Sequence, residues 1–469
     1  MNKNQTFWLF TIVIFLGLLL PSLVQKNMFL DGVTYASISK NLANGIGTLW
    51  CPQYTKTVSP KFFGHPPLVF IIQSLFFKIL GNGIYTERIF SFVTAIISAL
   101  GIIKLWKLFN INAEKENISW LPVLLWITVP IVFWSYSNNL LENTVSIFTL
   151  FAVYFISKSF IGTKKYFKYI GIFFIFLGFL SKGLVALFPL ILPLLFAITY
   201  GFKKYKFMPF HILFYTLILL FFFFISFLIF PDLKTNLTEY LHLQISPIFS
   251  GNEDITTNNR FSILLNLLLN LSLPILILFF FSFKEWKDKK SLNFLKNEKA
   301  IFFFLIGLSA SLPMIITLKQ RNFYLSPSIP FYALAISFWI QPFIKKIAEN
   351  LSIKKLKIFQ IVSFVLLGIA IIFTFSRYGK YSLNEAMIKD VYTISETIPK
   401  VTIIYTTSEL WNNWKLEAYL YRIAEISLSA DKEQEYFLIE KNKSIPKKIQ
   451  DKYKKTDIKL NKYQLFEKN

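Results

Sequence analysis

The segment FWLFTIVIFLGLLLPSLVQ, residues 7–25, is an unbroken apolar run about as long as the roughly 20 residues that a helix needs to cross a bilayer. Similar runs recur as far as about residue 376. With 54% hydrophobic and 18% aromatic residues in a chain of 469, the composition exceeds that of a soluble domain. Only Lys3 precedes the first run and no small-residue cleavage site follows it, so we interpret it as a retained span. The sequence therefore predicts an all-α polytopic membrane protein.

Hydropathy predicts about 11 transmembrane helices. They are expected at residues 7–25, 88–109, 118–136, 143–158, 166–181, 183–200, 209–230, 262–283, 300–318, 324–344 and 357–376. Every second connection between them is rich in lysine, including 104–115, 158–168, 203–206, KEWKDKK at 284–290 and IKKIAENLSIKKLK at 344–357. The formal charge of +24 is thus explained by lysines in the connections on one side of the membrane, and no nucleic acid partner is expected. By the positive-inside rule, the amino terminus is cytoplasmic and the carboxyl terminus lies outside the bacterial inner membrane.

The segment PPLVFIIQSLFFKIL, residues 66–80, determines on which side of the membrane every later connection lies. If it crossed the bilayer, every later connection would change sides and the charge rule would be inverted, so we interpret it as an interfacial helix within an outer loop at 26–87. After the transmembrane domain, residues 1–376, the composition becomes that of a soluble protein. We expect residues 377–469 to form a small periplasmic α/β domain, because pieces such as VTIIYT and YFLIE alternate with a helix-like stretch.

The predicted topology sends a group of polar side chains to the outer face. They are Asp31, Tyr35, His65, Arg88, Glu142, Lys182, His242, Arg260, Lys319, Arg321 and Tyr324. Lys182 interrupts the apolar stretch FLGFLSKGLVALFPL at a tight turn, which favours a functional role over a snorkelling flank. Asp31 and Glu142 could each be a functional acid or only cap a helix. His65 before two prolines could be a plain turn residue, and a lone His242 is more often a local hydrogen-bonding residue than a ligand.

The chain shows no phosphate loop, nucleophile elbow or CxxC pattern. Its three histidines are His65, His211 and His242, and His211 falls within a predicted span, so a histidine-built metal site is not expected. No cofactor is therefore assigned from the residues, and a divalent metal is left open.

Five pieces of the sequence, in this order, resemble a known family. They are LDGVTY with Asp31, FGHPPLVF, ERIFSFVTAIISAL opened by Arg88, LSKGLVAL with Lys182, and QRNFYLSPSIP. Together, over about residues 1–345, they resemble the GT-C membrane glycosyltransferases of the dolichyl-phosphate-mannose protein mannosyltransferase type, including the bacterial lipid A aminoarabinose transferase branch. Such enzymes transfer a sugar from a polyprenyl-phosphate carrier, in bacteria usually undecaprenyl phosphate, to an acceptor hydroxyl outside the inner membrane.

The resemblance implies roles for particular residues. Asp31 matches the essential acid and would be the general base, and Lys182 matches the lysine that binds the lipid phosphate. Arg88 and Arg321 are further candidates for that anion, since a guanidinium can bind phosphate through two parallel hydrogen bonds. The remaining candidates for the substrate cavity are Tyr35, Glu142, His242 and Tyr324, although Tyr324 could also be an interfacial aromatic anchor.

The chain also departs from the aminoarabinose transferase pattern. That enzyme has Glu and Arg where this chain has Gly32 and Thr34, and Glu-Lys where this chain has Gly64 and His65. A second cation near the lipid phosphate is thus absent, and His65 would take its place. The acid absent at Gly64 belongs to that enzyme's metal site, and its loss argues against a bound metal even though His242 matches the histidine of that site. These departures argue against lipid A aminoarabinose transfer but leave the reaction class intact.

Rival interpretations are a transporter or flippase, an O-antigen ligase or polymerase, and a non-catalytic scaffold. A transporter favours inverted repeats or charges at mid-membrane, whereas here the ionisable groups gather at one face. A ligase usually has its chemistry in a large late outer loop, whereas the long loop here comes first. The sequence indicates neither the sugar nor whether the acceptor is a glycan, a lipid or a protein.

Overall fold

The computed structural model describes residues 1–110, 118–162, 164–202, 208–251, 254–287 and 293–469. Several lysines of the connections at 104–115, 203–206 and 284–290 lie outside these ranges. The chain divides into two compact units. The helical unit consists of Met1–Leu23, Phe63–Val69 and Ser91–Ser376, and the mixed unit consists of Val24–Phe62, Phe70–Phe90 and Arg377–Asn469.

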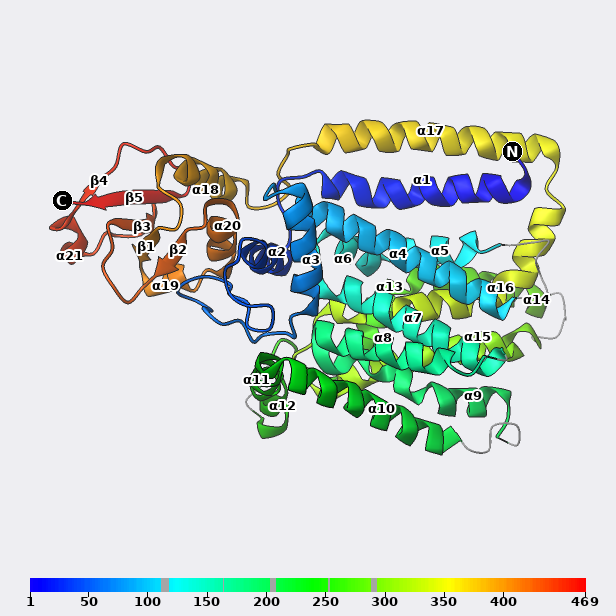
Figure 1. The fold of residues 1–469 in the computed structure, drawn as a ribbon. Helices are drawn as coiled ribbons and strands as arrows, with labels where there is room; N and C mark the ends of the chain where they lie inside the picture. The colour runs from blue at the N-terminus through cyan, green and yellow to red at the C-terminus, as the bar shows by residue number, and fades with distance from the viewer. Residues whose placement is uncertain (111–117, 163, 203–207, 252–253, 288–292) are drawn as a thin grey trace. The chain divides into compact units, whose positions relative to one another are not determined.

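Seven helical segments in the described residues are long and apolar enough to cross a membrane. They contain α1 (Lys3–Leu23), α4 (Thr86–Phe109), α7 (Leu141–Ile161), α8 (Phe167–Lys182), α10 (Met208–Ile229), α15 (Glu298–Ser311) and α17 (Ile353–Arg377). Helices α1 and α17 lie side by side (Figure 1), with the ring of Phe359 5.4 Å from Phe7 and 5.0 Å from Phe10. The first and last helices of the helical unit are therefore neighbours.

Two of the expected spans are sharply bent. The span expected at 118–136 consists of α5 (Trp120–Ile127) and α6 (Pro130–Ser137), which meet at 77°. Pro130 begins α6, and Val129 before it is extended, as the proline ring requires. The span expected at 262–283 consists of α13 (Ser262–Asn270) and α14 (Ser272–Lys287), bent by 65°. Counting each bent pair as one span gives up to nine in the described ranges, and the number eleven stays a prediction.

Shorter elements connect the long helices. The region expected at 183–200 contains η2 (Gly183–Ala186), η3 (Phe188–Ile191) and α9 (Leu192–Tyr200), and the region expected at 324–344 contains η7 (Asn322–Leu325) and α16 (Ile329–Glu349). The others are α11 (Pro231–Tyr240), the π-helical η4 (Leu241–Ile245), α12 (Ser246–Ser250), η5 (Asn293–Lys296) and η6 (Leu312–Ile316).

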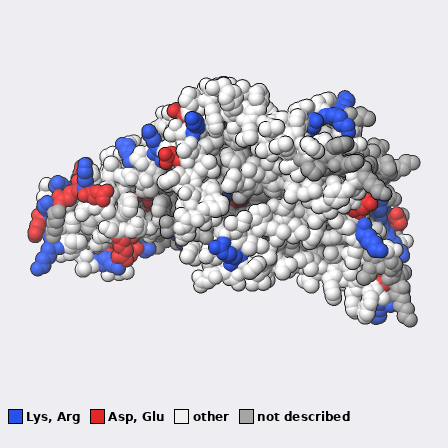
Figure 2. All heavy atoms as spheres, turned by 90° about the horizontal axis from the view of Figure 1, so that it is seen from below, with Lys and Arg blue, Asp and Glu red and all other residues white. Residues whose placement is uncertain are grey.

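Burial within the helical unit is uneven. The most apolar window of α7 is 67% buried, whereas those of α10 and α17 are 11% and 6% buried. On the face drawn in Figure 2, much of the helical unit is free of charged side chains. The exposed side chains of α10 and α17 are Leu, Ile, Val and Phe in large part, which lipid solvates without cost.

The mixed unit combines helices with a five-stranded sheet (Figure 1). Its helices are α2 (Leu30–Ala43), most of α3 (Leu68–Leu80), α18 (Glu385–Thr397), α19 (Ser408–Trp411), α20 (Trp414–Ala424) and α21 (Lys447–Gln450). Its strands are β1 (Ile403–Thr406), β2 (Ser427–Ser429), β3 (Tyr436–Glu440), β4 (Tyr453–Lys455) and β5 (Tyr463–Lys468), in the order β2-β1-β3-β5-β4. Strand β1 is parallel to β2 and β3, while β5 is antiparallel to β3 and β4.

An apolar core joins the early and late parts of the mixed unit. Met28 and Val33 are buried together with Val391 of α18, Leu420 of α20 and Leu428 of β2. The period of α20 produces this packing, because its apolar side chains recur three and four residues apart and therefore share one face. The expected α/β character of the C-terminal segment is confirmed.

Candidate functional site

The turn at Lys182 results from the glycine that follows it. Helix α8 ends at Lys182, and Gly183 has φ +74°, a conformation that favours glycine. A Cβ at Gly183 would overlap the ring of Tyr240, whose hydroxyl donates to the carbonyl oxygen of Lys182 at 3.3 Å. The SKG sequence therefore stops the helix and holds Lys182 at one position.

The Lys182 side chain is buried within the helical unit. Its side chain is 8% exposed and forms an ion pair with Oε1 of Glu142, whose side chain is 2% exposed. The ammonium also lies 4.8 Å from the ring centroid of Tyr324 and 5.7 Å from that of Phe323, within the range of cation–π attraction. The structure therefore brings together Glu142, Lys182 and Tyr324, three of the residues that the sequence singled out.

His65 belongs to the same cationic region. Its side chain is half-buried, and burial together with the positive charges of Lys182 and Lys319 lowers the pKa of its imidazole. The side chain is therefore neutral near pH 7 and can bind a ligand only as a neutral imidazole. Lys319 supplies a second positive charge, with its Nζ 3.0 Å from Asp254 and 3.3 Å from Gln244. The sequence placed Lys319 among the outward groups but gave it no role.

A buried glutamine organises the segment that carries Lys319 and Arg321. Gln320 is 6% exposed, and its amide nitrogen donates to the carbonyl oxygens of Arg260 at 2.6 Å and Thr317 at 3.0 Å. Its Oε1 accepts from the backbone N–H of Ile263 at 3.0 Å. Because Gln320 points inward, its neighbour Arg321 is exposed. Gln320 was not singled out from the sequence, although an amide between two cations in KQRN was an available signal.

His242 is not part of a metal-binding group of side chains in the part of the chain that the structure describes. It is exposed and belongs to the π-helical turn η4, an irregularity that often occurs at functional sites. Within the described ranges, no group of three or more His, Cys, Asp or Glu side chains is arranged to hold a metal ion.

Asp31 is the second residue of α2 in the mixed unit. The residue that begins this helix as its N-cap is Phe29, which is extended and makes no side-chain capping hydrogen bond. Asp31 is therefore not the N-cap, and it is partly exposed. Tyr35, one turn later, is buried with its ring 5.7 Å from that of Phe70. Residues four apart share one helix face, so Asp31 and Tyr35 face the same side.

Hydrogen bonds from distant residues fasten the chain just before Asp31. The hydroxyl of Tyr419 accepts from the backbone N–H of Met28 at 2.7 Å and donates to the carbonyl oxygen of the same residue at 2.8 Å. Arg88 donates from Nε to the carbonyl oxygen of Gln25 at 3.0 Å and from Nη2 to that of Asn27 at 3.4 Å. These contacts fix where α2 begins and therefore where Asp31 lies within the mixed unit.

A buried charge network surrounds Arg88. Glu87 accepts from Nη1 of Arg88 at 3.2 Å and from Nη2 of Arg422 at 2.7 Å, and all three side chains are less than 5% exposed. Arg422 also donates to the carbonyl oxygens of Asn82 at 3.1 Å and Gly83 at 2.8 Å. Neither Glu87 nor Arg422 was singled out from the sequence. Since 335 residues separate them, no local pattern could have indicated the pair.

Residues 64–230 match the family model described as dolichyl-phosphate-mannose-protein mannosyltransferase. This range includes His65, Arg88, Glu142 and Lys182. The structure is similar over nearly its whole length to that of ArnT from Cupriavidus metallidurans. In the apo state the TM-score is 0.64 at 10% identity, over 97% of this chain and 95% of that chain. The chain has the fold of ArnT.

The comparison with a second structure of ArnT agrees with this fold. For ArnT bound to undecaprenyl phosphate, the TM-score is 0.66 at 10% identity, over 98% of this chain and 97% of the other. A weaker likeness, with a TM-score of 0.49 at 12% identity over 90% and 63% of the two chains, is to the oligosaccharyltransferase AglB from Archaeoglobus fulgidus. No curated protein sequence matches the chain significantly. The GT-C resemblance expected from the five sequence pieces is confirmed, and the apolar helices make the chain a multi-pass membrane protein.

Proposed function

We propose that the chain is an inverting glycosyltransferase that moves a sugar from an undecaprenyl-phosphate-type carrier to an acceptor hydroxyl. The reaction would take place at the outer face of the bacterial inner membrane, with the amino terminus in the cytoplasm and the carboxyl terminus in the periplasm. The observation that carries the proposal is the buried Lys182, held by the Gly183 turn beside the ring of Tyr324. A lysine kept in so apolar a stretch fits a role in binding an anion at the membrane surface.

The cationic region of the helical unit suits the leaving group. When the bond between the anomeric carbon and the phosphate oxygen breaks, negative charge grows on the lipid phosphate, and preorganised cations stabilise that charge. Lys182 and Lys319 act together at His65, whose pKa both of them lower. We assign the phosphate to Lys182, with Lys319 and Arg321 as additional cations and neutral His65 as a hydrogen-bonding group. Glu142 then holds the Lys182 ammonium in place before the donor binds.

Asp31 is assigned to the acceptor. The acceptor oxygen attacks the anomeric carbon and its proton passes to the Asp31 carboxylate, while the phosphate leaves with the bonding electron pair. A general base held in this way contributes typically about 10²–10⁴-fold to the rate. The position of Asp31 supports the assignment, because it lies in the first turn of α2, two residues after the N-cap residue Phe29. Arg88 is assigned to positioning, since it ties Gln25 and Asn27 to the start of α4.

The experiment is transfer of radiolabelled sugar from undecaprenyl-phosphate donors to endogenous acceptors in membranes that contain wild type or Asp31→Asn protein at matched levels. Asp232→Asn is the matched control, because Asp232 is also in the first turn of a helix, α11, and is exposed. We expect Asp31→Asn to lower the transfer rate by about 10²-fold or more and Asp232→Asn to retain it. Full activity in Asp31→Asn would refute the mechanism, and no transfer by wild type would favour a transporter, a ligase or a scaffold.

A further inference from the structure

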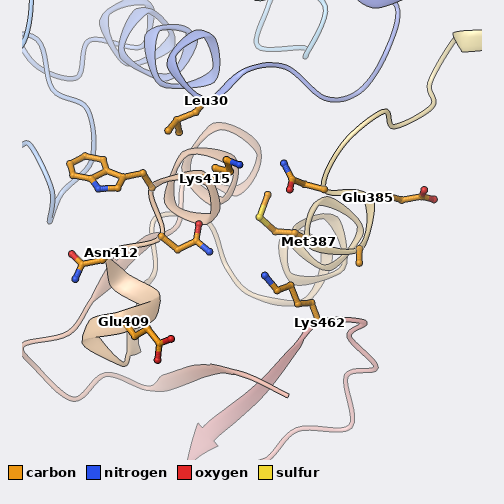
Figure 3. Close-up of a pocket in the computed structure, with 11 residues that line it drawn as sticks. Leu30, Glu385, Met387, Glu409, Asn412, Lys415 and Lys462 are labelled. Carbon is orange, nitrogen blue, oxygen red and sulfur yellow. The ribbon is translucent and has the colours of Figure 1, made fainter. Parts of the chain in front are cut away.

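The mixed unit contains an open hollow of about 760 Å³ that the proposed reaction does not use. It is lined from four directions, by Leu30 of α2, by the start of α18, by the turn between α19 and α20, and by Lys462 before β5. Figure 3 shows these side chains around a common space, with Leu30 on the α2 side and Glu409 and Lys462 on the side of the strands. Its volume is typical of small-molecule sites, which span about 300–1,000 Å³.

A second, smaller hollow adjoins the first. It measures about 120 Å³ and is lined by Thr407, just after β1, and by Ile439 and Glu440 at the end of β3. Glu409 and Asn413 line both hollows, so the two are adjacent, and together they are called the groove below. In open α/β sheets, ligands bind outside the carboxyl ends of parallel strands, and β1 and β3 are such a pair.

The groove combines an exposed aromatic ring with side-chain amides. Trp414 begins α20 and its side chain is 58% exposed, an unusual exposure for a tryptophan outside the apolar helices. Asn412 and Asn413 precede it, and the Asn413 Oδ1 accepts from the backbone N–H of Leu416 at 3.3 Å, which orients that amide. An aromatic face can carry the C–H face of a sugar ring, while amides both donate to and accept from hydroxyls.

The charges of the groove balance. Glu385 and Glu409 line it together with Lys415 and Lys462. Glu409 forms an ion pair with Lys443 at 3.0 Å, and Lys462 forms one with Glu440 at 3.1 Å. With no excess of either sign among these residues, the groove suits a neutral polyhydroxylated ligand better than a phosphate or a polyanion.

A peptide fits the groove less well. Peptides that bind sheets usually add a strand at an exposed edge, and the edge strands β2 and β4 contribute no side chain to the lining of either hollow among the described residues. A helical peptide needs a continuous apolar groove, whereas here the apolar lining consists mainly of Leu30, Ala386 and Met387 beside Trp414.

We propose that this groove is a saccharide-binding site, with a sugar ring on the Trp414 face and its hydroxyls hydrogen-bonded to Asn412, Asn413 and Glu409. The identity of the saccharide rests on the proposed function. If the chain carries out the proposed transfer, the bound saccharide is the glycan part of the acceptor. The acceptor class that the sequence left open is then a glycan or a glycan-bearing lipid, and the mixed unit recruits it.

The test is binding of soluble oligosaccharides to the purified full-length protein in nanodiscs, measured by saturation-transfer NMR. The probes are neutral trisaccharides of glucose, mannose, galactose and N-acetylglucosamine, with a peptide pool as the competing class. We expect at least one trisaccharide to bind wild type and Trp414→Ala to weaken that binding by about tenfold or more. Trp286→Ala is the matched control, because Trp286 is 65% exposed but belongs to α14 of the helical unit. Trp414→Phe, which keeps a ring, should retain part of the binding.

Several results would overturn the proposal. They are no trisaccharide binding by wild type, equal weakening by Trp414→Ala and Trp286→Ala, or binding of the peptide pool alone. Equal melting temperatures of wild type and Trp414→Ala exclude unfolding as the cause of lost binding. The transfer assay separates this proposal from the proposed function. Saccharide binding without transfer would refute the function and leave the groove, whereas transfer with no saccharide binding and an unchanged acceptor KM in Trp414→Ala would refute the groove alone.

Discussion

Replacing Lys182 with methionine would leave the Glu142 carboxylate buried without its counter-charge. Glu142 is 2% exposed, and its Oε2 has no hydrogen-bond partner among the described residues. Removing one partner of a buried ion pair costs about 3–5 kcal/mol, chiefly because the remaining charge is uncompensated. We therefore expect Lys182→Met to lower the free energy of unfolding by about that amount.

The double variant Lys182→Met/Glu142→Gln removes both charges at nearly constant volume. What it loses is the hydrogen bond of the pair, about 0.5–1.5 kcal/mol net, and the cation–π contact with Tyr324, about 1–2 kcal/mol. We thus expect the double variant to be more stable than Lys182→Met alone, although it carries one substitution more. It should also transfer no sugar, because the proposed phosphate-binding group is absent from a folded protein.

The assay is denaturant unfolding of the purified protein in micelles at pH 7, followed by circular dichroism. Lys452→Met is the matched control, because Lys452 pairs with Glu433 at 3.0 Å but its side chain is 45% exposed. An exposed pair contributes at most about 1 kcal/mol, so this variant should unfold almost like wild type. If the double variant is no more stable than Lys182→Met, or if Lys452→Met costs as much as Lys182→Met, the interpretation of Lys182 and Glu142 as a compensated buried pair is wrong.

Burial raises the pKa of Glu417 from 4.5 to about 7, so the folded state binds its proton more tightly than the unfolded state does. The contribution of Glu417 to stability is therefore greatest below about pH 4.5, falls by on the order of 3 kcal/mol as the pH rises to about 7, and is constant above that pH. Glu417→Gln should remove this contribution from the change in melting temperature between pH 4.5 and 8. A pH dependence equal to that of wild type would contradict the assignment. At the Lys182 turn, Gly183→Ala combines left-handed strain of about 1–3 kcal/mol with overlap on Tyr240. Gly81 also has a positive φ, +79°, but no atom lies within 4 Å of the Cβ that Gly81→Ala would add. Gly81→Ala should therefore lower the melting temperature less than Gly183→Ala does. Equal melting temperatures of the two variants would contradict the overlap with Tyr240.

Local features were predictable from the sequence. The helix expected at 66–80 is α3, Leu68–Leu80, because two prolines mark where it begins and an apolar run marks its length. Lys182 could be singled out because one lysine in an apolar stretch is visible without any structure. The bends between α5 and α6 and between α13 and α14 were not expected, because mean hydropathy is the same for a straight and a bent span.

Partners in the site were not predictable. Glu142 and Lys182 were each candidates, but their sequence separation of 40 residues gave no reason to pair them. Arg88 was expected to bind phosphate, which stays a prediction, and no sequence pattern indicated its contacts with Gln25, Asn27 and Glu87. A guanidinium binds carbonyl oxygens, carboxylates and phosphates with the same donors, so its residue type alone does not identify its partner.

By itself, the sequence determined that this chain is a multi-pass membrane protein with a small appended α/β segment and which few polar residues interrupt its apolar stretches. These properties depend on composition and short-range pattern, because transfer of apolar side chains from water to lipid is nearly additive along the chain. Only the tertiary structure decided which of those polar residues meet, namely Lys182 with Glu142 and Tyr324, and Glu87 with Arg422. A buried charge needs a partner at contact distance, and the packing of the helices, not their order in the chain, supplies that partner.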